Sequence, residues 1–166
     1  MERMRLLADT NFWLAYLLKE TGFYEPCARI LEETAAGNAE LYVAPTTVKD
    51  VFYMVPRRLR RMDAQEGRES VSYRPAAWAC IEFMLDCATP VPLSMAECEG
   101  ARMLRNSVGD FEDGLILAAA ERAEADYVLT FDRALLAALP EIFITPARCL
   151  ELLPLRFPTA NGMKGV

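Results

Sequence analysis

Val108-Gly109-Asp110-Phe111-Glu112-Asp113-Gly114-Leu115-Ile116-Leu117 places three acidic residues directly before one of the most apolar stretches of the chain, Leu115 to Ala120. If residues 115–125 form a helix, steps of three and four residues return to the same side, so Asp113 shares a face with Ile116. This pattern predicts that Asp113 begins a buried stripe. Because an unpaired charge is very costly to bury, its carboxylate must be protonated, paired or bound to a cation.

The composition is that of one globular domain. The chain has 166 residues, of which 53% are hydrophobic, enough for a sizeable core. It carries 18 basic and 24 acidic side chains and a formal net charge of -6, so net charge alone does not indicate a nucleic-acid-binding protein. No histidine is present, which excludes histidine general bases and histidine metal ligands.

The cysteines and the apolar runs bound the environment of the protein. Five dispersed cysteines form no Cys-x-x-Cys pair, so we interpret them as buried small side chains in a reducing cytoplasm and expect no zinc site. The beginning of the chain, Met1 to Arg5, leads into a short apolar run that Asp9 interrupts, which is typical of neither a signal peptide nor a membrane span. We therefore expect a cytoplasmic protein that does not engage a membrane.

Short apolar runs alternate with helical patterns along the chain. The expected strands are residues 5–8, 41–44, 91–93, 126–130 and 141–146. The expected helices are residues 12–19, 24–36, 48–60, 75–87, 94–105 and 115–125, with a short helix after residue 146. This alternation predicts an α/β fold, a three-layer α/β/α sandwich with a central, mainly parallel sheet of four to five strands.

The polar segments set the expected domain limits. One domain is expected over residues 1–153, followed by a C-terminal tail over residues 154–166, of which 161–166 should be disordered. From Met62 to Arg74 the composition turns polar, which predicts a loop or a mobile insertion.

Acidic residues from distant parts of the chain follow the predicted strands. Asp9 comes directly after the first strand, Asp50 soon after the second, and Asp132 two residues past Thr130 at the end of a later one. Right-handed crossovers bring the carboxyl ends of parallel strands to one edge of the sheet, where sites form. With Asp113, these side chains are expected to meet at that edge.

Taken singly, each acid also has a structural explanation. Thr47-x-x-Asp50 and Asp110-x-x-Asp113 are patterns of helix starts, where capping and the helix dipole favour acids in the first turn. Asp132 is placed to cap a helix over residues 134–139, and Asp9 to form an Asx turn.

Taken together, the carboxylates favour a metal site. Two carboxylates ~4 Å apart repel by roughly 4 kcal/mol at an effective dielectric of about 20, and only Lys49 and Arg133 adjoin these motifs as cations. Oxygen donors alone suit Mg²⁺ or Mn²⁺, which bind phosphates and activate water for phosphodiester hydrolysis. The expected metal ligands are Asp9, Asp50, Asp113 and Asp132, with Asp110 at an outer or second metal position. Thr10, Asn11 and Thr130 are expected to orient metal-bound water or a phosphate oxygen, and Glu112 to be solvated.

Basic and aromatic residues give weaker indications. The one basic cluster contains Arg57, Arg58, Arg60 and Arg61. It is placed to hold an RNA backbone beside the acids, or alternatively is a solvated helix end that the dipole favours. Trp13, Tyr16 and Trp78 are interpreted as core or interface residues rather than as base-stacking platforms.

These motifs together resemble the PIN-domain family, in the branch of the VapC-type toxins. The matching stretches are Leu7 to Asn11, Leu41 to Tyr53, Asp110 to Leu115 and Ala125 to Asp132, with Ile144-Thr145-Pro146 near the end. The resemblance implies an α/β/α fold and an endoribonuclease that depends on Mg²⁺ or Mn²⁺. It also implies a homodimer and, as in many relatives, a small antitoxin protein as partner.

Some features depart from the family pattern. Asp50 stands where the family usually has Glu, and its shorter arm is expected to alter metal geometry or weaken activity. Asp132 stands where the family often has Asn, and the connection over residues 62–74 looks longer than usual.

Other functions fit the sequence less well. A phosphorylatable receiver module needs a lysine after its last strand, and a haloacid-dehalogenase-type phosphatase needs an acid where this chain has Asn11. Another alternative is a catalytically weak PIN-like module that binds RNA or a partner protein. The presence of Asp50 in place of the usual Glu is the reason to consider it.

Overall fold

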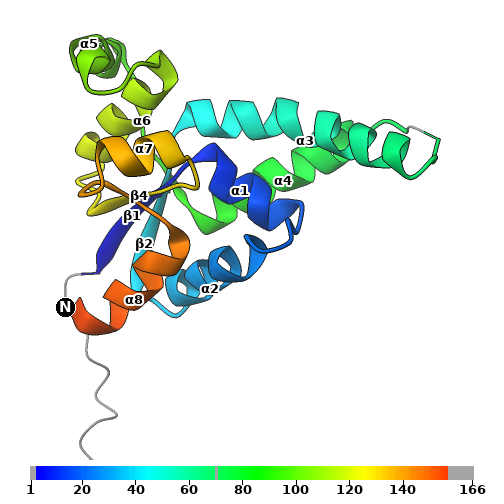
Figure 1. Ribbon diagram of the computed structural model, residues 1–166, viewed down its shortest axis with the longest axis horizontal. Helices are drawn as coiled ribbons and strands as arrows, with labels where there is room; N and C mark the ends of the chain where they lie inside the picture. Colours follow the sequence, from blue (N-terminus) through cyan, green and yellow to red (C-terminus); the bar gives the residue numbers. More distant parts are fainter. Residues whose placement is uncertain (1–2, 70, 157–166) are drawn as a thin grey trace, which may run out of the picture.

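A parallel β-sheet of five strands lies at the centre of the protein (Figure 1). The computed structural model describes residues 3–69 and 71–156. The strands are β1 (Met4–Ala8), β2 (Ala39–Val43), β3 (Thr89–Pro90), β4 (Tyr127–Leu129) and β5 (Phe143–Ile144). Their order across the sheet is β3-β2-β1-β4-β5, and every neighbouring pair is parallel.

Helices cover both faces of this sheet. They are α1 (Thr10–Leu17), α2 (Tyr24–Ala35), α3 (Pro45–Gln65), α4 (Arg74–Cys87), α5 (Met95–Met103), the 3₁₀ turn η1 (Leu104–Asn106), α6 (Phe111–Arg122), α7 (Arg133–Ala138) and α8 (Pro146–Arg156). Side chains of α1, α2, α3, α4 and α8 share one core, and those of α6 and α7 share the other. The predicted three-layer α/β/α sandwich with a parallel sheet is confirmed.

The two cores follow from the alternation of side chains along each strand. In β1, Leu6 and Ala8 belong to one core, whereas Leu7 between them belongs to the other. Trp13 of α1 is fully buried in the first core, as predicted, but Trp78 of α4 is 55% exposed. Trp78 is therefore not a core residue, and its alternative interpretation as an interface residue stays a prediction.

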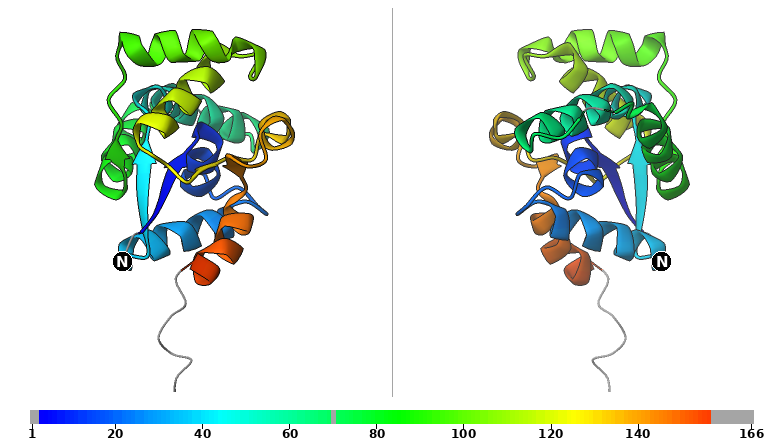
Figure 2. Two further views of the ribbon diagram at one scale, coloured as in Figure 1. Left: turned by 90° about the vertical axis from the view of Figure 1, so that its left-hand side faces the viewer. Right: turned by 90° about the vertical axis from the view of Figure 1, so that its right-hand side faces the viewer.

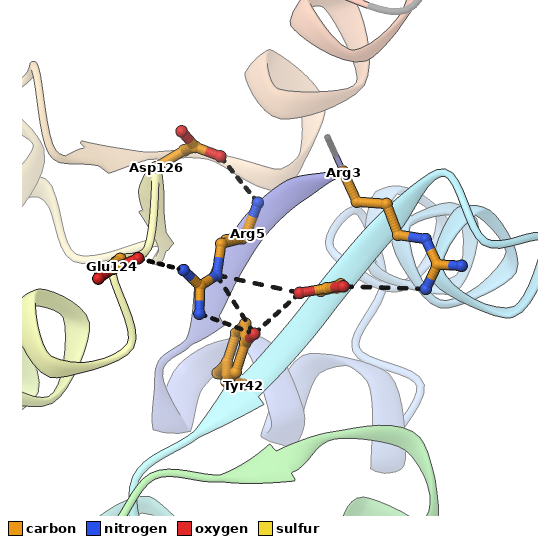
Figure 3. A network of polar contacts seen from close by, with 6 residues as sticks. Arg3, Arg5, Tyr42, Glu124 and Asp126 are labelled. Atoms are coloured by element: carbon orange, nitrogen blue, oxygen red, sulfur yellow. Dashed lines mark hydrogen bonds and ion pairs between the residues drawn. The ribbon is translucent and has the colours of Figure 1, made fainter. Parts of the chain in front are cut away.

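Polar side chains replace the apolar core at the amino-terminal end of the face that carries Leu7. There the guanidinium group of Arg5 donates to the Tyr42 hydroxyl, over 3.3 and 3.2 Å, and pairs with Glu124 at 2.6 Å (Figure 3). The Tyr42 hydroxyl donates in turn to Glu40 over 2.9 Å. This network ties β1 to β2 and to the turn before β4, at the end of the sheet opposite to the acids.

The segment predicted as a loop over residues 62–74 is helical at both of its ends. Helix α3 continues to Gln65 and α4 begins at Arg74, which leaves 66–73 as the connection, with residue 70 outside the described residues. Asp63 is buried because the Tyr73 hydroxyl donates to it and Arg68 pairs with it at 3.4 Å. An insertion relative to the family stays a prediction.

Other boundaries shift by a few residues. The third strand precedes the predicted 91–93 and lies at the sheet edge, where a strand that contains a proline is tolerated. Helix α8 extends three residues into the predicted tail, and 157–166, which include the segment predicted to be disordered, lie outside the described residues.

All five cysteines are free, in agreement with the sequence. Cys27 and Cys149 are buried, and burial raises the pKa of each thiol to about 12. The other three are half-buried. Within residues 3–69 and 71–156, no helix is long and apolar enough to cross a membrane.

Candidate active site

A pocket of about 450 Å³ lies at the carboxyl ends of the strands. The chain leaves β1 for β2 on one side and returns to β4 on the other, so the crevice outside β1 and β4 is the topological switch point where open α/β sheets bind ligands. The lining residues are Asp9, Thr10, Asn11, Leu14, Thr46, Thr47, Asp50, Tyr53, Met54, Arg57, Arg58, Glu112, Asp113 and Ile116. Four carboxylates against two guanidinium groups give this lining a formal charge of -2.

Asp9 is the acid held in place most firmly. It caps α1, and its Oδ1 accepts a hydrogen bond of 2.6 Å from the backbone of Thr10. Its Oδ2 accepts from the Thr130 hydroxyl over 2.9 Å and from Asn11 Nδ2 over 3.1 Å. Burial raises the pKa of Asp9, the Thr10 and Thr130 hydrogen bonds lower it, and the nearby charges of other acids raise it further.

Thr130 and Asn11 both donate hydrogen bonds to Asp9, and Asn11 also lines the pocket. Thr130 is fully buried, and its hydroxyl accepts from the backbone of Asp132 over 3.1 Å while donating to Asp9. Asn11 donates to Thr130 over 2.9 Å and accepts from the backbone of Phe131 over 2.9 Å. These hydrogen bonds link the ends of β1 and β4, and the contact of Thr130 with water or phosphate stays a prediction.

Asp113 lies in the first turn of α6, directly before the fully buried run from Gly114 to Ala120. Its side chain is half-buried at the start of this run. Burial raises the pKa of Asp113 to about 6, and the charges of Asp110, Asp9 and Asp132 add to this effect. The prediction that Asp113 needs a proton or a cation is consistent with this raised pKa.

The glycine after Asp113 is required by the packing of α5 on α6. A Cβ atom on Gly114 would lie 3.0 Å from the Cβ and 3.1 Å from the Cα of Ala101. Figure 2 shows α5 stacked on α6, on the side away from the sheet. The small residue lets the two helices meet closely at the turn that carries Asp113.

Asp50 reaches the pocket from the second turn of α3. The helix begins at Pro45 with Ala44 as its N-cap, so Thr47 is not the cap that the sequence suggested and Asp50 is not in the first turn. Lys49 Nζ lies 2.9 Å from Asp50 Oδ1 and 3.4 Å from Glu112 Oε1, which joins α3 to α6. Glu112 is exposed, as predicted, but it also lines the pocket.

Asp110 and Asp132 fulfil the capping roles that were the alternative explanation. Asp110 Oδ1 accepts from the backbone of Glu112 over 2.8 Å, and Asp132 Oδ1 accepts from that of Ala134 over 2.7 Å. Neither residue lines the pocket, yet the charges of both raise the pKa of Asp113. Asp110 and Asp132 therefore both cap a helix and add negative charge near Asp113.

The arginines divide between two pockets. Arg57 and Arg58 line the acidic pocket, Arg61 lines a neighbouring one, and Arg60 lines neither. Thr46 and Thr47 also line the acidic pocket, although neither was predicted as a site residue, and their buried hydroxyls have no hydrogen-bond partner among the described residues. The sequence signal that could have identified these two threonines as site residues is their position directly after β2.

The donor chemistry of the pocket fits a divalent cation. Its candidate ligands are all oxygen atoms, its lining is formally negative, and the acids raise one another's pKa values. In the part of the chain that the structure describes, no three acidic or cysteine side chains stand close enough to hold an ion between them.

The fold and the pocket define an α/β protein with a carboxylate-lined cleft at the switch point of a parallel sheet. A family model for the PIN domain matches residues 5–134, so the chain belongs to the PIN-domain family. PIN domains are generally nucleases, and membership supports a hydrolase that cleaves nucleic acid.

Solved structures share this fold at low sequence identity. VapBC2 from Rickettsia felis, bound to a DNA fragment from its promoter, is 15% identical, with a TM-score of 0.62 over 86% of this chain and 98% of that one. VapBC-1 from nontypeable Haemophilus influenzae is 14% identical, with a TM-score of 0.56 over 87% and 99%. FitAcB from Neisseria gonorrhoeae is 16% identical, with a TM-score of 0.53 over 86% and 98%. No curated protein sequence matches the chain.

Proposed function

We propose that this protein is a metal-dependent endoribonuclease that hydrolyses RNA phosphodiester bonds. The observation that carries the proposal is the meeting of Asp9 and Asp113, from distant parts of the chain, in one pocket where burial and the charges of neighbouring acids raise both pKa values. Burial and like charges disfavour the ionised form of such carboxylates, and a bound cation would offset this cost.

The residues of the pocket have distinct roles in this proposal. Asp9, Asp50 and Asp113 line the pocket and would hold Mg²⁺ or Mn²⁺ once their side chains move closer together, because no three described acids stand close enough as they are. The ion would supply Lewis-acid activation of water and of the phosphate. Asp132 and Asp110 add negative charge around the ion. Thr130 and Asn11 hold the Asp9 carboxylate in one orientation.

Arg57 and Arg58 line the same pocket and would contact phosphates on either side of the scissile bond. Arg57 has no ion-pair partner within the described ranges, so its guanidinium group is available for an anion. The pocket thus combines a cation site with groups that neutralise the substrate backbone.

We further infer that the protein is the toxin of a toxin-antitoxin pair. The sequence motifs resemble those of VapC-type toxins, and the fold is shared with structures of VapBC2 and VapBC-1. The partners would be an RNA substrate, a small antitoxin protein and a second copy of the chain, all in the cytoplasm. Co-purification of a small protein would support the antitoxin partner. A mass in solution twice that of the chain would support the homodimer.

One observation favours a catalytically weak binding module instead. Asp50 stands where the family usually has Glu, and it already pairs with Lys49 at 2.9 Å. If that pair persists when a cation is offered, the module would bind RNA or a protein without cleaving it.

Cleavage of a panel of structured RNAs distinguishes the two functions. With Mg²⁺ or Mn²⁺ we expect cleavage that EDTA abolishes, and a loss of about a hundredfold or more in Asp9→Asn and Asp113→Asn. Asp86→Asn, an exposed acid on α4, is the matched control and should cleave like the parent. Metal-independent cleavage, or Asp9 and Asp113 variants as active as the parent, would contradict the proposed function.

A further inference from the structure

A second pocket, of about 430 Å³, adjoins the acidic one at the carboxyl end of α1. Its lining residues are Leu18, Lys19, Glu20, Thr21, Arg58, Arg61, Met62 and Gln65. We propose that this basic pocket binds a backbone phosphate of the nucleic-acid strand whose neighbouring phosphate occupies the acidic pocket. The inference rests on the proposed function, and it extends the contact surface to Lys19, which lies far from the arginines in sequence.

The charges of the two pockets are opposite. Three cationic side chains, Lys19, Arg58 and Arg61, face one carboxylate in the basic pocket, a formal charge of +2. Among the described residues, Arg58 is the one of these three cations that is paired, through a contact of 3.3 Å with Glu20. Within residues 3–69 and 71–156, neither Lys19 nor Arg61 makes an ion pair, so both are free to contact an anion.

Arg58 lines both pockets and therefore joins them. A ligand that spans the two must offer one group to a metal ion and another group to cations. Successive phosphates of a single strand meet both needs, because each phosphate is an anion that also coordinates divalent cations. A carboxylate of an acidic protein segment also coordinates divalent cations, so an acidic peptide is included as a competitor in the test below.

The backbone at Lys19 provides an independent indication. Lys19 has φ of 51°, in the left-handed region. The amide of Lys19 bonds to the carbonyl of Tyr16 over 3.1 Å, and that of Glu20 to the carbonyl of Ala15 over 2.9 Å, which is the helix ending where glycine is preferred. Lys19 therefore carries a backbone strain that glycine would avoid, while its side chain lines the basic pocket.

This conformation also gives a test variant that should fold well. Lys19→Gly removes the charge and places the residue best suited to a positive φ, so the melting temperature should equal or exceed that of the parent. Arg61→Ala removes the second unpaired cation from an exposed helix surface. Arg29→Ala, an exposed arginine on α2, is the matched charge control.

Binding of labelled single-stranded RNA by the full chain tests the basic pocket. A 12-nucleotide strand and a dinucleotide with one phosphate would be compared by fluorescence anisotropy, with Ca²⁺ in place of Mg²⁺. For the longer strand, we expect Lys19→Gly and Arg61→Ala each to weaken binding about fivefold and to reduce the salt slope by about 0.7. Binding of the dinucleotide and of Mn²⁺ should stay at the parental level in both variants, and Arg29→Ala should match the parent throughout.

The outcomes separate this proposal from the nuclease assignment, because cleavage is not the readout. Weaker binding in both variants supports the basic pocket even if the parent cleaves no RNA. Parental affinity for the longer strand in both variants, or equal losses for the dinucleotide, would overturn it. A hexaglutamate peptide that competes as strongly as an RNA of equal charge would also overturn it and would indicate an acidic protein segment as the occupant.

Discussion

The hydroxyl of Thr130 donates a hydrogen bond of 2.9 Å to Oδ2 of Asp9, across 121 residues of sequence. Asp9 follows β1 and Thr130 follows β4, which are neighbours at the switch point of the sheet. The contact therefore fixes the orientation of a carboxylate at the place where the topology forms a ligand crevice. A packing residue at the end of a strand thus becomes a positioning residue for the site.

Replacing Thr130 by Val tests this positioning role. The substitution keeps the shape but removes the donor to Asp9 and the acceptor of the Asp132 amide. Because both partners lose a buried hydrogen bond, the free energy of unfolding should fall by about 1–3 kcal/mol in urea denaturation. RNA cleavage should fall as well, and Thr130→Ser, which keeps the hydroxyl, should recover most of both losses. A serine variant no better than valine would contradict the role.

The contact of α5 with α6 predicts opposite effects at two glycines. Gly114→Ala places a Cβ 3.0 Å from that of Ala101, so α5 must move, and stability should fall by about 1–3 kcal/mol. Gly100→Ala meets its nearest atom at 3.6 Å and should instead gain about 0.5–1 kcal/mol from helix propensity. Thermal denaturation of both variants checks the pair, and equal effects would argue against the close approach.

The raised pKa of Asp113 predicts how stability varies with pH. In the metal-free protein, the pKa of Asp113 is about 6, above its unfolded value of about 3.9. Protonation is thus favoured in the folded state, so the stabilising contribution is complete below pH ~4 and is lost as the pH rises through ~6. The melting temperature in EDTA should fall across this window, and less so for Asp113→Asn.

Cation binding should show the reverse dependence. A divalent ion requires the ionised carboxylate, so the rise in melting temperature on adding Mn²⁺ should be larger at pH 7.5 than at pH 5. Glu97 does not interfere, because hydrogen bonds from Ser94 and Arg122 lower its pKa to about 2, below this window. A Mn²⁺ effect that is the same at both pH values would contradict the assignment.

Lys49 should compete with the cation for Asp50. Its ammonium group lies 2.9 Å from Asp50 Oδ1, and a charge at ~6 Å from a dication costs roughly 1 kcal/mol in a water-like dielectric. Lys49→Gln should therefore tighten Mn²⁺ binding about fivefold in calorimetric titration, while Arg29→Gln should leave it unchanged. Weaker binding in Lys49→Gln would show that the lysine supports the site instead.

Local pattern was sufficient to predict the sheet and the acids at its edge. Buried strands such as β1 are short apolar runs that end at a cap residue, and parallel topology then brings Asp9 and Asp113 together. The caps at Asp110 and Asp132 also follow from local spacing. These features depend on residues that are close in sequence or on general rules of topology.

Features that depend on distant contacts were not predictable. Helix α3 continues through Asp63 because Tyr73 and Arg68 hold this carboxylate, whereas the polar composition alone suggested a loop. The partner of Thr130 and the pocket that joins Lys19 to Arg61 arise only when separate elements pack together. Sequence order carries no direct signal for such pairings.

The proposed function requires that the carboxylates at the switch point bind a divalent cation. Anomalous diffraction from crystals soaked in Mn²⁺ would locate such an ion. We expect a peak within about 2.5 Å of oxygen atoms from both Asp9 and Asp113, the range of such metal–oxygen bonds, and no peak there in crystals of Asp113→Asn. A saturating soak that gives no peak at these carboxylates, or a peak that persists in Asp113→Asn, would contradict it.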